Sequence, residues 1–180
     1  GGTFSHKILL NSRNGSLNIH KVAKEIDTGE IVFNRSFKYP TNLKIPIDFI
    51  NYKEKIEIDF FAKFVELLKT KKNLKGRKQK TSNSFYWPLL NTKMNGIIDW
   101  NWKIDQIYYF INAFDDPYDG ASTKYKKELV YLKKCSISKT KLKFHPFHYG
   151  LVVRKNLKSI YVAVNGGLLS IDYVFNKDKK

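Results

Sequence analysis

The hydrophobic and polar positions in the first part of the chain predict two strands around a turn. Within residues 7–34, Leu17 and Ile19 precede an Asp-Thr-Gly turn at 27–29, and an apolar run follows at 31–33. A run of β-branched and aromatic residues after a glycine turn is typical of a strand. We therefore expect a short hairpin here.

A helical period follows between residues 53 and 70, where large apolar side chains recur with charged side chains between them. The apolar positions are Phe60, Phe61, Phe64, Val65 and Leu68. We expect this helix to pack against a sheet. Residues 40–51 contain Pro40 and Pro46 and predict a loop or an irregular crossing.

The second half of the chain predicts one helix and several short strands. Residues 103–114 place Ile104, Ile107 and Ile111 on one helical face, and the helix should end before Pro117. The strands are predicted at 129–132, 151–154, 160–164 and 168–174, with an Asn-Gly-Gly hairpin turn at 165–167. This combination is typical of a small barrel or an open sheet.

A basic segment separates the two halves. Seven of the twelve residues from 69 to 80 are Lys or Arg, and no acidic residue occurs between Glu66 and Asp99. This shift in composition predicts a domain boundary near 80–88. The basic run is either a solvated linker or a contact to the phosphates of an acceptor molecule, and the sequence leaves both alternatives open.

Composition limits the class of protein. The chain has 180 residues, 42% of them hydrophobic and 15% aromatic, so a packed core is expected. Cys135 is the only cysteine, which excludes an intrachain disulfide, and no apolar run approaches the ~20 residues of a membrane helix. The formal net charge of +17 favours polyanionic partners, but an AT-rich genome gives the same excess of lysine.

Two segments carry a family resemblance. Ile19-His20, followed after five residues by 26–31 (IDTGEI), resembles the T-x-H…D-x-G-x-I segment that closes the catalytic domain of 10-formyltetrahydrofolate-dependent formyltransferases. Residues 96–100 (GIIDW) and 117–123 (PYDGAST) are similar to the opening of the C-terminal domain in methionyl-tRNA and amino-sugar formyltransferases. This chain departs from the patterns at Asn18, Lys103, Asn112 and Asp119.

The resemblance implies an α+β chain. Residues 1–70 would be the tail end of a Rossmann-like formyltransferase catalytic domain, 71–88 a basic linker, and 89–180 a small OB-like β-barrel C-terminal domain. The family's N-x-H segment would lie upstream of Gly1, and the chain lacks an initiator Met, so we expect a fragment of a longer enzyme.

The resemblance also assigns site residues. Asp27 matches the catalytic Asp of the family, and His20, Thr28 and Gly29 are expected to line the folate pocket. From local sequence alone, Asp27 also fits an Asx-type turn, and His20 also fits a strand histidine bonded to a backbone carbonyl. His145 and His148 lack further ligands for zinc, and no metal is expected.

The implied function is transfer of a formyl group from 10-formyltetrahydrofolate to a primary amine. The acceptor would be a nucleotide-linked amino sugar, favoured by Asp116-Pro117-Tyr118, or methionyl-tRNA, favoured by the basic charge. We further expect a cytoplasmic protein, no membrane contact and a homodimer through the C-terminal domain. A non-catalytic basic module that binds RNA or a partner subunit is the alternative from another class.

The first testable prediction concerns local stability. Residues 1–50 should be the least stable part of the chain, because strands without their upstream neighbours expose unpaired backbone groups. Hydrogen exchange should show faster amide exchange there than in residues 97–174. Equal protection of the two regions would contradict this expectation.

Overall fold

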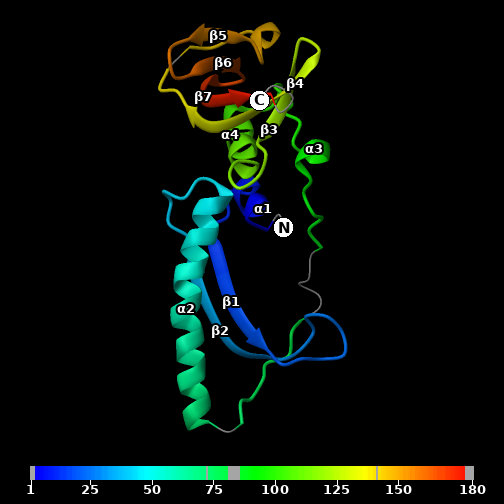
Figure 1. The fold of residues 1–180 in the computed structure, drawn as a ribbon, viewed down its shortest axis with the longest axis vertical. Coiled ribbons are helices and arrows are strands. Elements are labelled where there is room, and N and C mark those ends of the chain that lie inside the picture. Colours follow the sequence, from blue (N-terminus) through cyan, green and yellow to red (C-terminus); the bar gives the residue numbers. More distant parts are fainter. Residues whose placement is uncertain (1–2, 72, 81–85, 141, 177–180) are drawn as a thin grey trace. The chain divides into compact units, whose positions relative to one another are not determined.

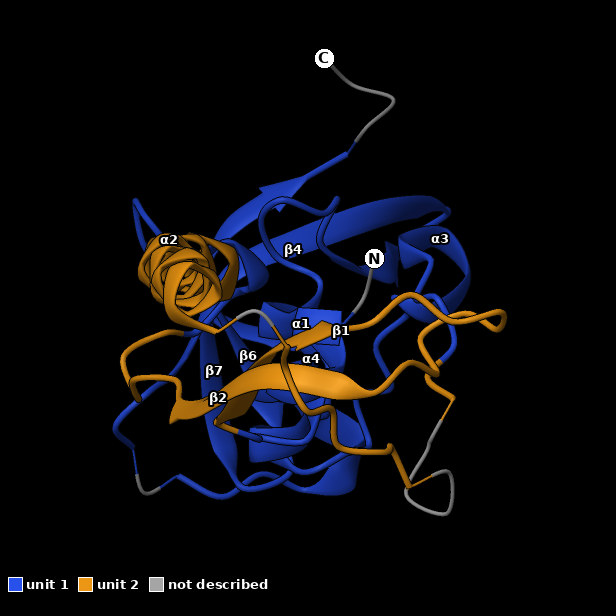
Figure 2. Ribbon diagram, turned by 90° about the horizontal axis from the view of Figure 1, so that it is seen from below, with its two compact units in different colours: residues 1–12, 44–47, 88–180 blue, residues 13–43, 48–87 orange. Residues whose placement is uncertain are grey.

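A computed structural model of the chain describes residues 3–71, 73–80, 86–140 and 142–176. The chain divides into two compact units, which Figure 2 distinguishes by colour. One unit comprises residues 13–43 and 48–87, and the other comprises 1–12, 44–47 and 88–180. We call them the hairpin unit and the sheet unit and describe each by itself.

The hairpin unit contains a strand pair and a long helix (Figure 1). Strands β1 (Asn14–His20) and β2 (Ile31–Lys38) pair antiparallel, with Leu17 opposite Arg35, so the predicted hairpin is confirmed. Helix α2 runs over Pro46–Thr70, which confirms the predicted helix but corrects its start, because 46–51 was expected to be loop. Proline is favoured in the first helical turn, where its missing N–H has no intrahelical partner to lose.

Aromatic packing joins α2 to β2. The Phe33 ring lies 4.9 Å from Phe60 and 5.6 Å from Phe64, measured between ring centroids. The predicted apolar face of α2 is nevertheless only partly covered by the described residues, since Phe61 is 61% exposed and Leu68 is 47% exposed. Packing against a two-stranded ribbon covers one stripe of the helix and leaves the neighbouring stripe exposed.

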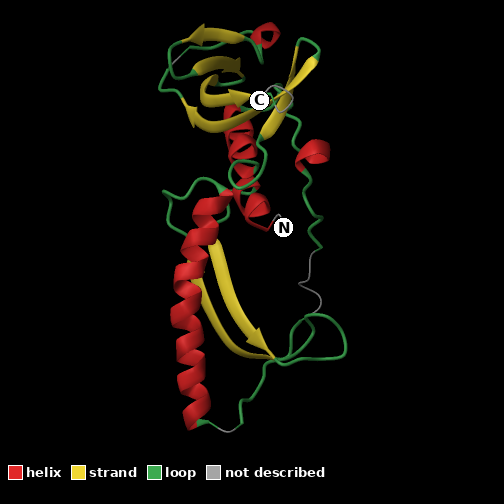
Figure 3. Ribbon diagram, viewed as in Figure 1, coloured by secondary structure: helices red, strands yellow, loops and turns green. Residues whose placement is uncertain are grey.

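The sheet unit is a five-stranded antiparallel sheet with a helix on it (Figure 3). The strands lie in the order β3-β4-β7-β6-β5. Their bounds are β3 Ala121–Tyr125, β4 Glu128–Ile137, β5 Val152–Lys155, β6 Ile160–Val164 and β7 Gly167–Phe175. Four of these strands were predicted from apolar patterning; β3 was not, because its sequence ASTKY has no apolar run. The turn at Asn165-Gly166 joins β6 to β7 as expected.

The expected OB-like barrel is not confirmed. Among the described residues the strands form an open sheet, with β3 and β5 at its two edges. The fold is therefore confirmed at the coarser level, as a mixed chain ending in an antiparallel sheet. The Rossmann-like assignment of residues 1–70 stays a prediction.

Helices complete the sheet unit. Helix α4 (Ile104–Ala113) confirms the predicted second helix and contacts β4, β3 and β7, with Ile107 and Ile111 fully buried. Helix α1 (Thr3–Leu9) contacts α4, and its Ser5 hydroxyl donates to the carbonyl of Ala113 at 2.7 Å. The short helices α3 (Thr92–Asn95) and η2 (Pro146–His148) were not predicted.

Buried Asp115 fixes the chain after α4. Its carboxylate accepts hydrogen bonds from the backbone N–H groups of Asp116 and Lys134, both at 2.7 Å, and its side chain is fully buried. A buried carboxylate satisfied by backbone donors is a structural anchor. No helix of the described residues is long and apolar enough to cross a membrane.

The packing predicts unequal costs for two leucine substitutions in the sheet unit. Leu169 lies in β7, the central strand, and is fully buried, whereas Leu157 in the β5–β6 turn is fully exposed. Leu169→Ala should lower the free energy of unfolding by about 2–5 kcal/mol, because it removes apolar contacts and leaves a cavity. Leu157→Ala should change it by less than about 0.5 kcal/mol.

Chemical denaturation followed by far-ultraviolet circular dichroism measures both changes. Equal effects of the two substitutions would contradict the packing described for β7.

Candidate functional site

The structure brings Asp27 and His20 together. The Asp27 carboxylate lies 3.5 Å from His20 Nε2, and six residues lie between the two in sequence. His20 ends β1, and Asp27 lies in the loop that leads to β2. Its φ of 58° is in the left-handed region, which Asp tolerates better than most residues.

The two side chains differ in exposure, and the second ring nitrogen of His20 has a backbone partner. The Asp27 side chain is 85% exposed and the His20 side chain 35%. His20 Nδ1 lies 3.1 Å from the carbonyl oxygen of Lys21, so an N–H on Nδ1 donates to that carbonyl and leaves Nε2 facing Asp27. The backbone carbonyl expected as a partner of His20 is therefore present, and the Asp27 carboxylate lies on the other side of the ring.

Hydrogen bonds close the loop around Asp27. The Lys21 N–H donates to the Glu30 carbonyl at 3.0 Å, and the Lys21 ammonium donates to the Glu30 carboxylate at 2.9 Å. This hydrogen bond and the charge of Lys21 lower the pKa of Glu30. The Gln79 side-chain amide donates to the carbonyls of Asp27 and Gly29, at 2.7 and 2.8 Å.

Gly29 is required by the chain itself. A Cβ at this position would lie 1.7 Å from the carbonyl oxygen of Lys21, closer than any two such atoms can approach. The absence of a side chain lets the two arms of the loop lie against each other. The neighbouring Thr28 is exposed, and its hydroxyl donates to the Glu25 carbonyl at 2.9 Å.

A groove of about 370 Å³ lies beside this pair. Asp27 and His20 line it together with β1 residues and with side chains from two more distant segments. Those distant residues are Lys53 and Glu57 of α2 and Gln79 of the basic segment. Sequence inspection missed all three, because nothing in their local patterns marks them as parts of a site. Thr28 and Gly29 do not line this groove, and their place in a folate pocket stays a prediction.

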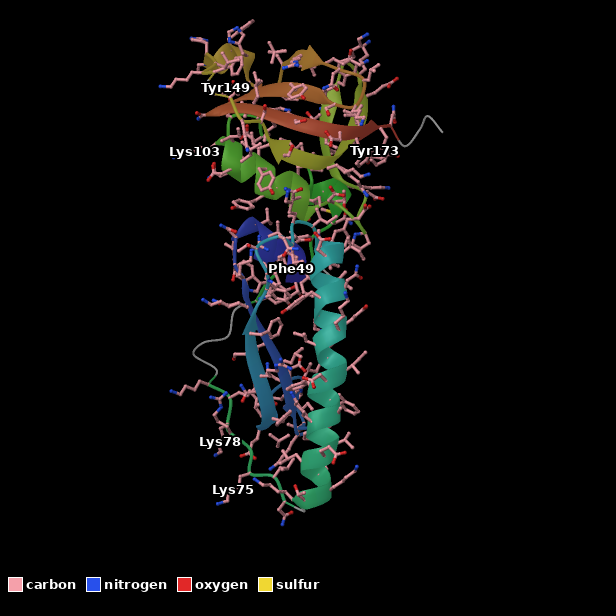
Figure 4. All side chains as sticks on the ribbon, turned by 90° about the vertical axis from the view of Figure 1, so that its left-hand side faces the viewer. Phe49, Lys75, Lys78, Lys103, Tyr149 and Tyr173 are labelled. Carbon is pink, nitrogen blue, oxygen red and sulfur yellow. The ribbon has the colours of Figure 1, made fainter. Side chains whose placement is uncertain are left out.

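The basic segment is partly integrated into the hairpin unit. Backbone hydrogen bonds of 2.9 and 2.8 Å pair Arg77 with Ile31 at the start of β2. The exposed side chains of Lys75 and Lys78 project away from this segment (Figure 4). Residues 72 and 81–85 of the predicted linker lie outside the described residues. Arg77 therefore forms an isolated antiparallel bridge with Ile31 of β2.

The remaining candidates have structural roles. Burial raises the pKa of the Cys135 thiol well above its usual range, which makes the thiolate nucleophile unavailable at neutral pH. Trp100 donates from Nε1 to the Thr123 hydroxyl at 2.9 Å, and Trp102 packs edge-on against buried Phe110, with ring centroids 5.0 Å apart. Among the described residues, no group of His, Cys, Asp and Glu could hold a metal ion.

A model of a known protein family matches the C-terminal half of this chain. Residues 91–180, half of the chain, match the model described as "Formyl transferase, C-terminal domain". The chain therefore belongs to the formyltransferase family, as the sequence resemblance predicted. A comparison with curated protein sequences gives no match.

Solved structures show the same fold. HypX from Aquifex aeolicus is similar with a TM-score of 0.73 and 18% identity over 98% of this chain, which spans 31% of HypX. The N-formyltransferase of Helicobacter canadensis, in complex with folinic acid and dTDP-3-aminofucose, is similar with a TM-score of 0.62 and 18% identity. The match covers 94% of this chain and 59% of that enzyme. The methionyl-tRNA formyltransferase of Clostridium thermocellum is similar with a TM-score of 0.56 and 24% identity. The match covers 78% of this chain and 59% of that enzyme. One structure of HypX contains tetrahydrofolic acid.

The loop geometry predicts the effect of one substitution. Gly29→Ala should open the loop, because its Cβ and the Lys21 carbonyl oxygen cannot both keep their places. The Lys21 amide should then exchange at least about tenfold faster, which corresponds to about 1.4 kcal/mol. Hydrogen exchange by NMR measures this rate.

Thr28→Ala is the matched control, because Thr28 is the exposed neighbour and its hydroxyl bonds only to the Glu25 carbonyl among described contacts. Unchanged exchange at Lys21 in the Gly29→Ala variant would show that the close approach is absent.

Proposed function

We propose that the protein containing this chain transfers a formyl group from 10-formyltetrahydrofolate to a primary amine. The observation that carries the proposal is the pairing of Asp27 with His20 beside a groove, in a chain of the formyltransferase family. Neighbours of the same fold contain tetrahydrofolic acid or folinic acid, which supports a folate as formyl donor.

Formyl transfer needs a carboxylate near a histidine. The amine attacks the formyl carbon, a tetrahedral oxyanion forms, and the amine loses a proton while the folate nitrogen gains one. An amide and a histidine cation stabilise the oxyanion, and a carboxylate holds the orientation and charge of the histidine and relays a proton through water. We assign the carboxylate role to Asp27. In this proposal the amide and a second histidine are supplied by the N-x-H segment of the family.

His20 and the loop residues support Asp27 in this proposal. His20 Nε2 lies 3.5 Å from the carboxylate on the β1 side, and His20 lines the groove. Gly29 acts indirectly by letting the loop close, and Thr28 stays next to the carboxylate without lining the groove. Residues 1–70 would complete the catalytic domain and 89–180 would form the C-terminal domain, joined by 71–88.

We favour a nucleotide-linked amino sugar as the acceptor. Asp116-Pro117-Tyr118 resembles the D-P-Y of sugar enzymes, and a neighbour of the same fold is in complex with dTDP-3-aminofucose. Methionyl-tRNA is the second candidate, supported by the net charge of +17 and by the fold of the methionyl-tRNA formyltransferase. Purified protein offered both acceptors with 10-formyltetrahydrofolate decides between them. We further propose a cytoplasmic homodimer formed through the C-terminal domain.

The central test is Asp27→Asn in the full-length protein that contains this chain. The substitution keeps the size of the side chain and removes its charge, so formyl transfer should fall by about 10²–10⁴-fold. Glu25→Gln is the matched control, because Glu25 is an exposed carboxylate in the same loop and does not line the groove.

Near-normal transfer by the Asp27→Asn variant would remove Asp27 from the reaction. Absence of transfer from the unmodified full-length protein, together with RNA binding that falls steeply with salt, would favour the non-catalytic basic module instead.

A further inference from the structure

A second groove lies in the sheet unit, and none of the residues assigned to formyl transfer lines it. Its volume is about 570 Å³, larger than the groove beside Asp27. All five strands contribute to its lining, as do Trp100 and the segment 149–151. Volumes of about 300–1,000 Å³ with a mainly apolar lining and few polar groups are typical of small-molecule sites.

The apolar lining of this groove has a buried floor and an exposed rim. Leu132 and Val162 are each 2% exposed, whereas Leu151, Val152 and Tyr125 are 47%, 51% and 60% exposed. Large apolar side chains exposed around a buried apolar floor favour a ligand with an apolar body, because binding removes that surface from water.

The charged side chains that line the groove are both positive. Lys124 and Lys155 are the only charged residues in the lining, and neither forms an ion pair with a residue that the structure describes. Outside the lining, the Lys126 ammonium lies 5.6 Å from the centre of the Tyr125 ring, and Glu128 pairs with Tyr125 across the β3–β4 turn. With no carboxylate in the lining, the groove is complementary to an anion.

One wall of the groove is fixed by the fold. Gly150 has a φ of 86°, and a Cβ there would lie 2.8 Å from the Trp100 ring, so this ring packs directly against the Gly150 backbone. The Gly150 N–H donates to the Ala163 carbonyl at 2.9 Å, and the Ala163 N–H donates to the Leu151 carbonyl at 3.0 Å. The hydrogen bond from Trp100 to Thr123 ties the same ring to β3. Tyr149, labelled in Figure 4, lines the groove beside this wall.

We propose that this groove binds a small amphipathic anion: a molecule with an apolar, ring-sized body held on the strands and one phosphate or carboxylate held between Lys124 and Lys155. A nucleic acid strand fits less well. Stacking of successive bases needs free aromatic faces, and one face of Trp100 is occupied by Gly150. The proposal adds a second binding site and does not depend on formyl transfer.

The test uses the 180-residue chain and three probes: 2-naphthyl phosphate, its neutral counterpart 2-naphthol, and inorganic phosphate. In NMR titrations, 2-naphthyl phosphate should give saturable shifts at Leu151, Val152 and Thr123. 2-Naphthol should bind the same residues more weakly, and inorganic phosphate should produce no saturable shifts there. Shifts from 2-naphthyl phosphate that map elsewhere, or no saturation, would overturn the proposal.

Substitutions of the lysines and of an apolar lining residue test the contributions of charge and of apolar contact separately. The double substitution Lys124→Gln with Lys155→Gln should weaken 2-naphthyl phosphate about tenfold and leave 2-naphthol within about twofold, since only the anion loses its partners. Lys55→Gln is the charge control, because Lys55 is exposed on α2 and lies outside the groove. Val152→Trp should weaken both naphthyl probes by filling the groove at its exposed edge.

Circular dichroism confirms that each variant is folded before it is titrated. If Lys55→Gln weakened the binding of 2-naphthyl phosphate equally, the loss of binding would be explained by net charge alone, and the proposal would be wrong. Displacement of 2-naphthyl phosphate by a single-stranded RNA oligonucleotide, with strong salt dependence, would replace the small anion by RNA as the occupant.

Discussion

Backbone hydrogen bonds between segments distant in sequence hold both grooves of this protein. In the hairpin unit, Lys21 pairs with Glu30 and Arg77 pairs with Ile31, and these bonds close the loop that carries Asp27. In the sheet unit, Gly150 and Leu151 pair with Ala163 and fix the wall of the second groove. Buried or partly buried backbone groups must find partners, so each pairing also determines where the adjacent side chains can lie.

Glycine makes two of these arrangements possible. At Gly29 a side chain would overlap the Lys21 carbonyl, and at Gly150 it would overlap the Trp100 ring. The two positions serve different surfaces but follow the same rule: two segments approach more closely than any Cβ permits. At Gly29 the protein's own backbone already occupies the space that a side chain would need.

The two grooves have different chemistry. The first contains a carboxylate, an imidazole, a lysine and a glutamate, from Asp27, His20, Lys53 and Glu57, which suits proton transfer and polar substrates. The second is mainly apolar, with two lysines that form no ion pair with a described residue, which suits binding alone. Different roles can therefore reside in one basic chain, because among the described residues carboxylates pair with lysines near Asp27, along α2 and at Lys133–Asp116, whereas no such pair lies in the lining of the second groove.

Local patterns in the sequence determined the strands β1, β2 and β7, the helix α4 and the pairing of Asp27 with a glycine turn, because these depend on near neighbours. Tertiary structure alone decided the rest. Polar β3 became a strand by pairing with β4, and α2 began at Pro46 inside a segment that had the composition of a loop. Gln79 and Glu57 joined the groove of Asp27 through folding over long sequence separations. Such contacts depend on which backbone groups and apolar stripes remain to be covered after local structure forms, and no local pattern encodes that.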